Sequence, residues 1–184
     1  NIFILFGLSI FAFILLAYLI MYVPKFDYIQ SRIFSFFNRD TGTHNFQSDK
    51  AIESITSGGY FGKGIGEGTL KNRVPEAHTD YIISVISEEF GVVAIMLILL
   101  LFLMFIYMVF KKINYEKDDK TKLVLIGCVS LILMQATIHV GVNIRLFPTT
   151  GMTLPFLSYG GSSIVSISIL SGIILNLTKR KIEN

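Results

Sequence analysis

Residues 81–110 read YIISVISEEFGVVAIMLILLLFLMFIYMVF, an almost unbroken apolar stretch. The hydrocarbon layer of a bilayer is about 30 Å thick, and an α-helix needs about 20 apolar residues to cross it. Residues 1–23, 123–142 and 156–177 have similar length and character. The sequence therefore predicts an all-α membrane protein, and these four segments are its expected transmembrane helices.

The composition agrees with this class. Hydrophobic residues make up 52% of the 184-residue chain and charged residues 16%, against about 25% charged in soluble domains. Cys128 is the single cysteine, which excludes a disulfide framework. The chain opens with Asn1 inside an apolar run, so we expect further sequence before it. A signal peptide is disfavoured because residues 1–23 lack a basic start and three more spans follow.

Basic residues predict the orientation of the helices. The short loop 111–122 and the tail 178–184 are rich in lysine and arginine, which favours the cytoplasmic side of the membrane. Alternation then places the long loop 24–80 and the shorter loop 143–155 outside the cytoplasm. The net charge of +3 is spread over these flanks, so the sequence gives no sign of a nucleic-acid-binding surface.

The long loop 24–80 has a pattern of its own, and loops of this length are often functional. Apolar residues recur at helical spacing within residues 46–57, which predicts a short amphipathic helix. A glycine run then covers residues 58–68, where the backbone can take positive φ angles and approach a ligand or another backbone closely. A nucleotide-binding loop is disfavoured because no Gly-Lys-Ser/Thr motif closes the run; a flexible re-entrant or surface loop is the simpler interpretation.

Asp80 ends the polar segment PEAHTD, residues 75–80, immediately before the second predicted span. Thr79 or Asp80 could simply be the N-cap of that helix. However, Asp80, Ser84 and Glu88 recur at four-residue spacing, which places them on one helix face together with Ser87. A carboxylate at membrane depth indicates a functional site or a paired structural group. Glu88 should therefore face a cavity or a basic partner, whereas Glu89 should point away.

A second polar stripe follows the third predicted span. Gln135, His139 and Asn143 recur every four residues and lead to Arg145. For Gln135 and His139 we expect hydrogen bonds between helices, which commonly hold membrane bundles together. Arg145 lies at the expected outer interface, where it could meet an anionic headgroup or a carboxylate.

Residues 148–163 read PTTGMTLPFLSYGGSS and open the fourth predicted span. Two prolines, three glycines and several hydroxyls predict irregular backbone at membrane depth, which is tolerated where protein or a water-filled cavity covers it. We expect this segment to line the same outer cavity as Asp80. Its small residues could equally form a close helix contact.

These blocks resemble, in order and spacing, the C-terminal half of the shape, elongation, division and sporulation (SEDS) family of bacterial membrane proteins. The blocks that carry the likeness are SGG at residues 57–59 with the glycines after it, residues 75–80, EEFG at residues 88–91, and residues 148–163. The resemblance covers essentially the whole chain. It is closer to the division branch than to the elongation branch, and it implies a larger bundle of about ten helices.

The resemblance implies peptidoglycan glycosyl transfer, in which lipid II is polymerised into glycan strands outside the membrane. Asp80 aligns with the acid proposed as catalytic in the family and would be the general base. The resemblance also implies a class B penicillin-binding protein and other division proteins as partners, at the septal membrane. The expected substrate-binding residues are Lys71, Arg73, Glu76, His78, Thr79, Glu88, Arg145, Thr149, Ser158, Tyr159 and Ser162.

Two other functions remain open from the sequence alone. A lipid II flippase would also need a polar path through the membrane, and a non-catalytic scaffold would recruit the transpeptidase. No cofactor is evident. A divalent cation bridging the diphosphate is compatible with the sequence, although the sequence has no dense cluster of carboxylates that would indicate a cation site.

Overall fold

The computed structural model describes residues 2–37, 43–74 and 76–179. It divides into two compact units, Asn1–Phe46 and Gln47–Asn184, each of which is described by itself. The described residues form helices and connecting turns and contain no strand. The prediction of an all-α fold is therefore confirmed.

The first unit is a bent pair of helices. Helix α1 (Ile2–Tyr22) occupies most of the segment predicted as the first span. A 3₁₀ turn, η1 (Pro24–Phe26), leads into α2 (Asp27–Phe37). Proline at the first position of η1 fixes φ and removes a donor, which suits the start of a helical turn. The axes of Phe6–Tyr22 and Asp27–Phe37 differ by 94°. Helix α2 was not predicted within the loop 24–80.

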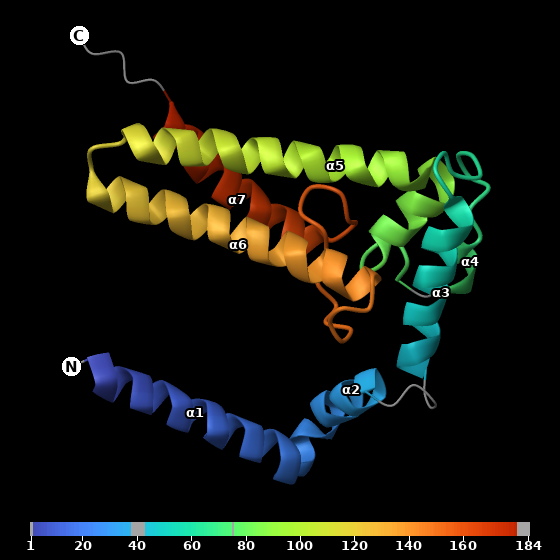
Figure 1. The fold of residues 1–184 in the computed structure, drawn as a ribbon, viewed down its shortest axis with the longest axis horizontal. Coiled ribbons are helices and arrows are strands. Elements are labelled where there is room, and N and C mark those ends of the chain that lie inside the picture. Colours follow the sequence, from blue (N-terminus) through green and yellow to red (C-terminus); the bar gives the residue numbers. More distant parts are fainter. Residues whose placement is uncertain (1, 38–42, 75, 180–184) are drawn as a thin grey trace. The chain divides into compact units, whose positions relative to one another are not determined.

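The second unit contains most of α3 (Thr43–Gly58), the short α4 (Leu70–Arg73), α5 (Ile82–Tyr115), α6 (Asp119–Asn143) and α7 (Gly161–Thr178). Figure 1 shows α5 and α6 side by side, joined by a short turn, with α7 beside them. Helices α5, α6 and α7 are each long and apolar enough to cross a membrane. The bent pair of the first unit would be a fourth span if it crosses as one.

The helix ends differ from the predicted spans because hydropathy does not record capping. Helix α5 continues to Tyr115 instead of ending at residue 110, and α6 begins at Asp119 instead of residue 123. The Asp118 side chain accepts hydrogen bonds from the backbone N–H groups of Lys120 and Thr121, which starts α6 inside the polar loop. Helix α7 begins at Gly161, later than the predicted 156: Phe156 has a φ of 66°, outside the helical region, and the N-cap Gly160 is extended.

Two apolar clusters hold the second unit together. The first lies between α5, α6 and α7 and includes the buried Cys128, which is a packed thiol; its other buried members are Val109, Ile113, Leu125, Val129, Ile132, Ile167 and Ile174. The second lies under the loops and includes Ala51, Leu70, Val74, Ala77, Tyr81, Val85 and Val142. The loop segments therefore pack on the ends of α5 and α6.

Candidate functional site

Asp80 closes a tight turn that begins at Glu76. The carbonyl of Glu76 accepts hydrogen bonds from the backbone N–H groups of Thr79 and Asp80, both at 3.0 Å, and from the Thr79 hydroxyl at 2.9 Å. Glu76 itself has a φ of 62°. Helix α5 begins at Ile82, and its N-cap, Tyr81, makes no capping hydrogen bond with its side chain. Thr79 and Asp80 therefore precede the N-cap position, and the Thr79 hydroxyl bonds to Glu76.

The loop between α6 and α7 is fastened to this turn. The Ser158 hydroxyl donates to the carbonyl of Thr79 at 2.7 Å and accepts from the N–H of Leu154 at 2.8 Å. The N–H of Tyr159 donates to the carbonyl of His78 at 3.1 Å. Ser158 is 5% exposed. Segments about eighty residues apart in the sequence are thus hydrogen-bonded to each other, and the shared outer cavity expected for them stays a prediction.

Asn143, the last residue of α6, fixes Asp80 from the other side. Its amide Nδ2 donates to the carbonyl of Asp80 at 3.0 Å and to the carbonyl of His139 at 2.9 Å. Its Oδ1 accepts from the hydroxyl and the N–H of Ser84, at 2.8 and 3.3 Å. Asn143 is fully buried. One amide therefore joins α6, the first turn of α5 and the Asp80 backbone.

The Asp80 carboxyl group lies beside Gly151 in the loop between α6 and α7, and the Asp80 residue is partly exposed. A Cβ atom added at Gly151, which has a φ of 69°, would lie 3.6 Å from Asp80 Oδ2. Glu76, Arg145 and Phe156 are the described non-glycine residues with positive φ, and all three belong to the segments around Asp80. Backbone strain of this kind persists where the surrounding structure enforces it and is common at functional sites.

Gln135 and His139 attach the loop between α6 and α7 to α6. Gln135 Nε2 donates to the carbonyl of Thr153 at 2.9 Å and lies 3.1 Å from the hydroxyls of Thr153 and Ser163. His139 Nδ1 lies 2.7 Å from the carbonyl of Met152. The expected hydrogen bond between helices is the one from Gln135 of α6 to Ser163 of α7. The other contacts of Gln135 and His139 go to the loop between α6 and α7.

Glu88 is buried and has a full set of donors from the long loop. Lys63 Nζ and the Thr69 hydroxyl lie 2.9 and 3.1 Å from Oε1, and the N–H groups of Thr69 and Leu70 each lie 3.0 Å from Oε2. Glu88 is 1% exposed. The expected basic partner is therefore Lys63, and these contacts fasten the start of α4 to α5. The Cγ atom of Glu89 also approaches Gly68, so Glu89 does not point away from this loop.

The glycine run crosses a break in α5. Gly91 has φ and ψ of 81° and 178°, which interrupts the helix. The N–H groups of Val92 and Val93 donate instead to the carbonyls of Gly59 and Tyr60, at 3.0 and 3.3 Å. In return, the N–H groups of Lys63 and Gly64 donate to the carbonyls of Glu88 and Glu89, at 2.9 and 3.1 Å. The run therefore supplies the hydrogen bonds that the break removes.

Close backbone approach explains why glycine is required there. A Cβ atom at Gly62 would lie 2.2 Å from the carbonyl oxygen of Glu89, and one at Gly91 would lie 2.2 Å from that of Tyr60. Such distances are too short for any side chain. The glycine run was expected to approach either a ligand or another backbone, and the structure shows approach to another backbone.

Two of the three predicted cationic residues pair with acids on α3. Arg145 forms an ion pair with Asp49, and Arg73 lies 4.0 Å from Glu53. Lys50 also donates to Glu53, and this hydrogen bond and charge, with a smaller contribution from Arg73, hold the pKa of Glu53 below its ordinary value. Lys71 belongs to α4, but its side chain lies outside the described residues.

The remaining predicted residues differ in exposure. His78 and Ser162 are exposed, the Tyr159 residue is 80% exposed, and Thr149 is partly buried. Among the described residues, no group of three or more His, Cys, Asp and Glu side chains could hold a metal ion. Whether any of these residues contacts a substrate stays a prediction.

Asn143, Gly151 and Lys63 were absent from the predicted site. Asn143 could have been found from its four-residue spacing after His139, which placed it at the helix end nearest to Asp80. Nothing local in the sequence distinguishes Lys63 from other loop lysines or Gly151 from other glycines.

The chain matches the model of the FtsW, RodA and SpoVE family, described as cell cycle protein, over residues 1–183. The "Probable peptidoglycan glycosyltransferase FtsW" of Enterococcus hirae is 34% identical over 190 residues, covering 98% of this chain and 48% of that protein. The protein of the same name from Caulobacter vibrioides is 38% identical over 157 residues, covering 85% and 40%. The chain thus spans about half the length, or less, of these relatives.

A solved structure shares the fold. A chain in "Structural coordination of polymerization and crosslinking by a peptidoglycan synthase complex" matches with a TM-score of 0.73 and 24% identity, covering 95% of this chain and 48% of that chain. Together with the apolar helices, these matches indicate a multi-pass bacterial membrane protein. The chain belongs to the FtsW, RodA and SpoVE family of cell cycle proteins, which is the SEDS family that its motifs resemble.

Proposed function

We propose that the protein containing this chain is a peptidoglycan glycosyltransferase that polymerises lipid II at the outer face of the cytoplasmic membrane. Relatives named peptidoglycan glycosyltransferase support the activity. The position of Asp80 supports the site: the residue is partly exposed, while its backbone is held by hydrogen bonds to Glu76 and Asn143. A partly exposed aspartate on a fixed backbone is the observation that carries the proposal.

Asp80 would act as the general base. The acceptor sugar hydroxyl must lose its proton as its oxygen attacks the anomeric carbon of the donor, and a carboxylate within hydrogen-bonding reach can take that proton. The bond from the anomeric carbon to the diphosphate breaks, and undecaprenyl diphosphate leaves with the electron pair. Preorganisation favours this role because Asp80 cannot drift away without breaking the Asn143 and Glu76 hydrogen bonds.

The leaving diphosphate needs positive charge nearby. Lys71, Arg73 and Arg145 are our candidates. Arg73 and Arg145 are held by Glu53 and Asp49 of α3, so each would exchange a carboxylate for the diphosphate when substrate binds. Bidentate pairing makes arginine well suited to both partners.

The lipid chain would lie against apolar helix surface. A cavity of about 330 Å³ between α5 and α6 is lined almost entirely by apolar side chains, among them Ile83, Phe102, Val140 and Leu154. Leu154 also belongs to the loop fastened by Ser158. The cavity therefore extends from the loop segments near Asp80 along the helices, and we propose that it holds part of the undecaprenyl chain.

A class B penicillin-binding protein and other division proteins are the proposed partners, and the septal membrane is the proposed location. The name of the relatives supports the division branch. The solved structure that shares the fold comes from a peptidoglycan synthase complex that coordinates polymerization and crosslinking, which supports a crosslinking enzyme as partner.

The test compares variants of the full-length protein, purified with its partner and supplied with labelled lipid II. Asp80→Asn should abolish glycan polymer while leaving the complex with the transpeptidase intact. Glu67→Gln is the matched control because Glu67 is an exposed carboxylate of the same loop, and it should polymerise normally. Normal polymerisation by Asp80→Asn would refute the assignment.

The flippase alternative receives less support from the helices. Glu88 and Gln135, the residues that suggested a polar path, are engaged by Lys63, Thr69, Leu70, Thr153 and Ser163. A scaffold without activity would need no fixed carboxylate at the loop junction. Translocation of labelled lipid II by Asp80→Asn at the wild-type rate, with polymer lost, would assign Asp80 to polymerisation alone.

A further inference from the structure

The glycine run presents three large apolar side chains outward. Tyr60, Phe61 and Ile65 are 78%, 85% and 79% exposed, and we call these three side chains the loop tip. The backbone around them is fixed to α5 by the hydrogen bonds of Gly59, Tyr60, Lys63 and Gly64. The three side chains are therefore exposed on a loop whose backbone is fixed. Exposed apolar surface of this kind indicates a contact with a membrane or another protein.

The loop tip is bonded to α5 just after the break at Gly91. The N–H of Val93 donates to the carbonyl of Tyr60, just after the break at Gly91. The apolar part of α5 after the break, residues 92–110, is about 28 Å long at 1.5 Å per residue, close to the thickness of a hydrocarbon layer of about 30 Å. Tyr60 is thus bonded to the first turn of the span.

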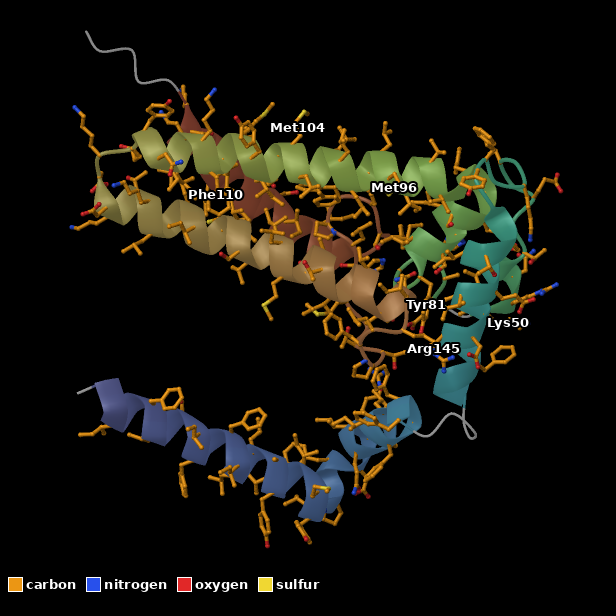
Figure 2. The ribbon with its side chains drawn as sticks, in the orientation of Figure 1. Lys50, Tyr81, Met96, Met104, Phe110 and Arg145 are labelled. Atoms are coloured by element: carbon orange, nitrogen blue, oxygen red, sulfur yellow. The ribbon has the colours of Figure 1, made fainter. Side chains whose placement is uncertain are left out.

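The exposed face of α5 continues from the loop tip along the span. Val93, Met96, Leu97, Leu100 and Met104 recur at helical spacing and are 46–62% exposed. Met96 and Met104 are labelled on α5 in Figure 2. Helix α5 is long and apolar enough to cross a membrane, so the loop tip continues an exposed apolar face of an expected membrane span.

We propose that the loop tip inserts into the interfacial layer of the bilayer and binds lipid. Tyrosine is favoured at this depth because its ring is apolar and its hydroxyl reaches the headgroups. The one cation between Phe61 and Ile65, Lys63, is turned to Glu88 at 2.9 Å, which removes a charge that would oppose insertion. The tip thereby tethers the glycine run, and through Thr69 and Leu70 the start of α4, to the membrane surface.

The experiment measures depth in the full-length protein, reconstituted in nanodiscs of phosphatidylethanolamine and phosphatidylglycerol. Cys128 and any other cysteine are replaced, and a nitroxide label is attached at Phe61→Cys or Ile65→Cys. Leu100→Cys on the exposed face of α5 is the lipid control, and Glu53→Cys on α3, which is 56% exposed in its side chain, is the water control. Collision with oxygen, which concentrates in lipid, is compared with collision with a water-soluble nickel complex.

Labels at the loop tip should favour oxygen over nickel, as at Leu100 and opposite to Glu53. A nickel preference would overturn the proposal, because the tip would then lie in water. Protection from both reagents would also overturn it, because the tip would then be covered by protein. An independent measurement on the unlabelled wild type uses a photoactivatable phospholipid: adducts on peptides containing Tyr60 and Phe61 support insertion, and their absence beside adducts on α5 argues against it.

Discussion

Lys63 Nζ lies 2.9 Å from Glu88 Oε1, and this ion pair joins the glycine run to the helix that follows Asp80. Glu88 is 1% exposed, while the Lys63 side chain is 37% exposed. The pair is therefore asymmetric: the lysine can reach water, whereas the carboxylate depends on protein donors. Loss of the carboxylate should therefore destabilise the fold more than loss of the lysine.

Glu88→Gln should lower the free energy of unfolding by about 1–3 kcal/mol, the range for losing hydrogen bonds to a buried charged acceptor. A glutamine has one acceptor oxygen, so one side of the amide would present N–H₂ to donors such as Lys63 or the N–H of Leu70. Thermal unfolding of the full-length protein in detergent measures this. Glu67→Gln should unfold at the wild-type temperature; equal shifts in both variants would contradict the role assigned to Glu88.

Gly91→Ala should be among the severe substitutions in α5. An added Cβ would lie 2.2 Å from the carbonyl oxygen of Tyr60, and φ is already 81°, so the glycine run would have to move away from the helix break. Gly127→Ala in α6 is the control, because nothing lies within 4 Å of its Cβ, and helix propensity favours alanine by about 1 kcal/mol. We expect a lower yield of folded protein for Gly91→Ala and none lost for Gly127→Ala.

Asn143→Asp tests the support of Asp80. The remaining carboxyl oxygen can still accept from Ser84, but the group that donated to the Asp80 carbonyl becomes an acceptor and repels it. We expect polymerisation to fall at least tenfold in kcat while complex formation with the transpeptidase persists. Labelled lipid II gives kcat and KM together. A change in KM alone would show that Asn143 does not act through Asp80.

Ser158→Ala tests the junction between the two loops. The substitution leaves the N–H of Leu154 and the carbonyl of Thr79 without the hydroxyl at 2.8 and 2.7 Å, and burial makes each loss costly, about 1–3 kcal/mol. Ser166→Ala should have little effect, because Ser166 is an exposed serine of α7 whose hydroxyl donates to the carbonyl of Ser162 within the same helix. Stability and polymer length are the measurements, and similar losses in both variants would contradict the junction.

Periodicity and hydropathy predicted the helices that hold the site, because both properties are local. The apolar runs indicated α5, α6 and α7, and the four-residue spacing placed Ser84 and Glu88 on the buried face of α5. Helix ends were predicted less well, since capping by Asp118 and the positive φ of Phe156 depend on individual backbone contacts.

The sequence by itself determined the membrane-protein class, the family and the prominence of Asp80. Tertiary structure alone decided which groups are neighbours: Asn143 at the Asp80 carbonyl, Ser158 between the loops and Lys63 at Glu88. The physical reason is that a hydrogen bond requires two groups about 3 Å apart. The separation of such groups along the chain, 63 residues for Asn143 and Asp80, carries no information about that distance until the helices have packed.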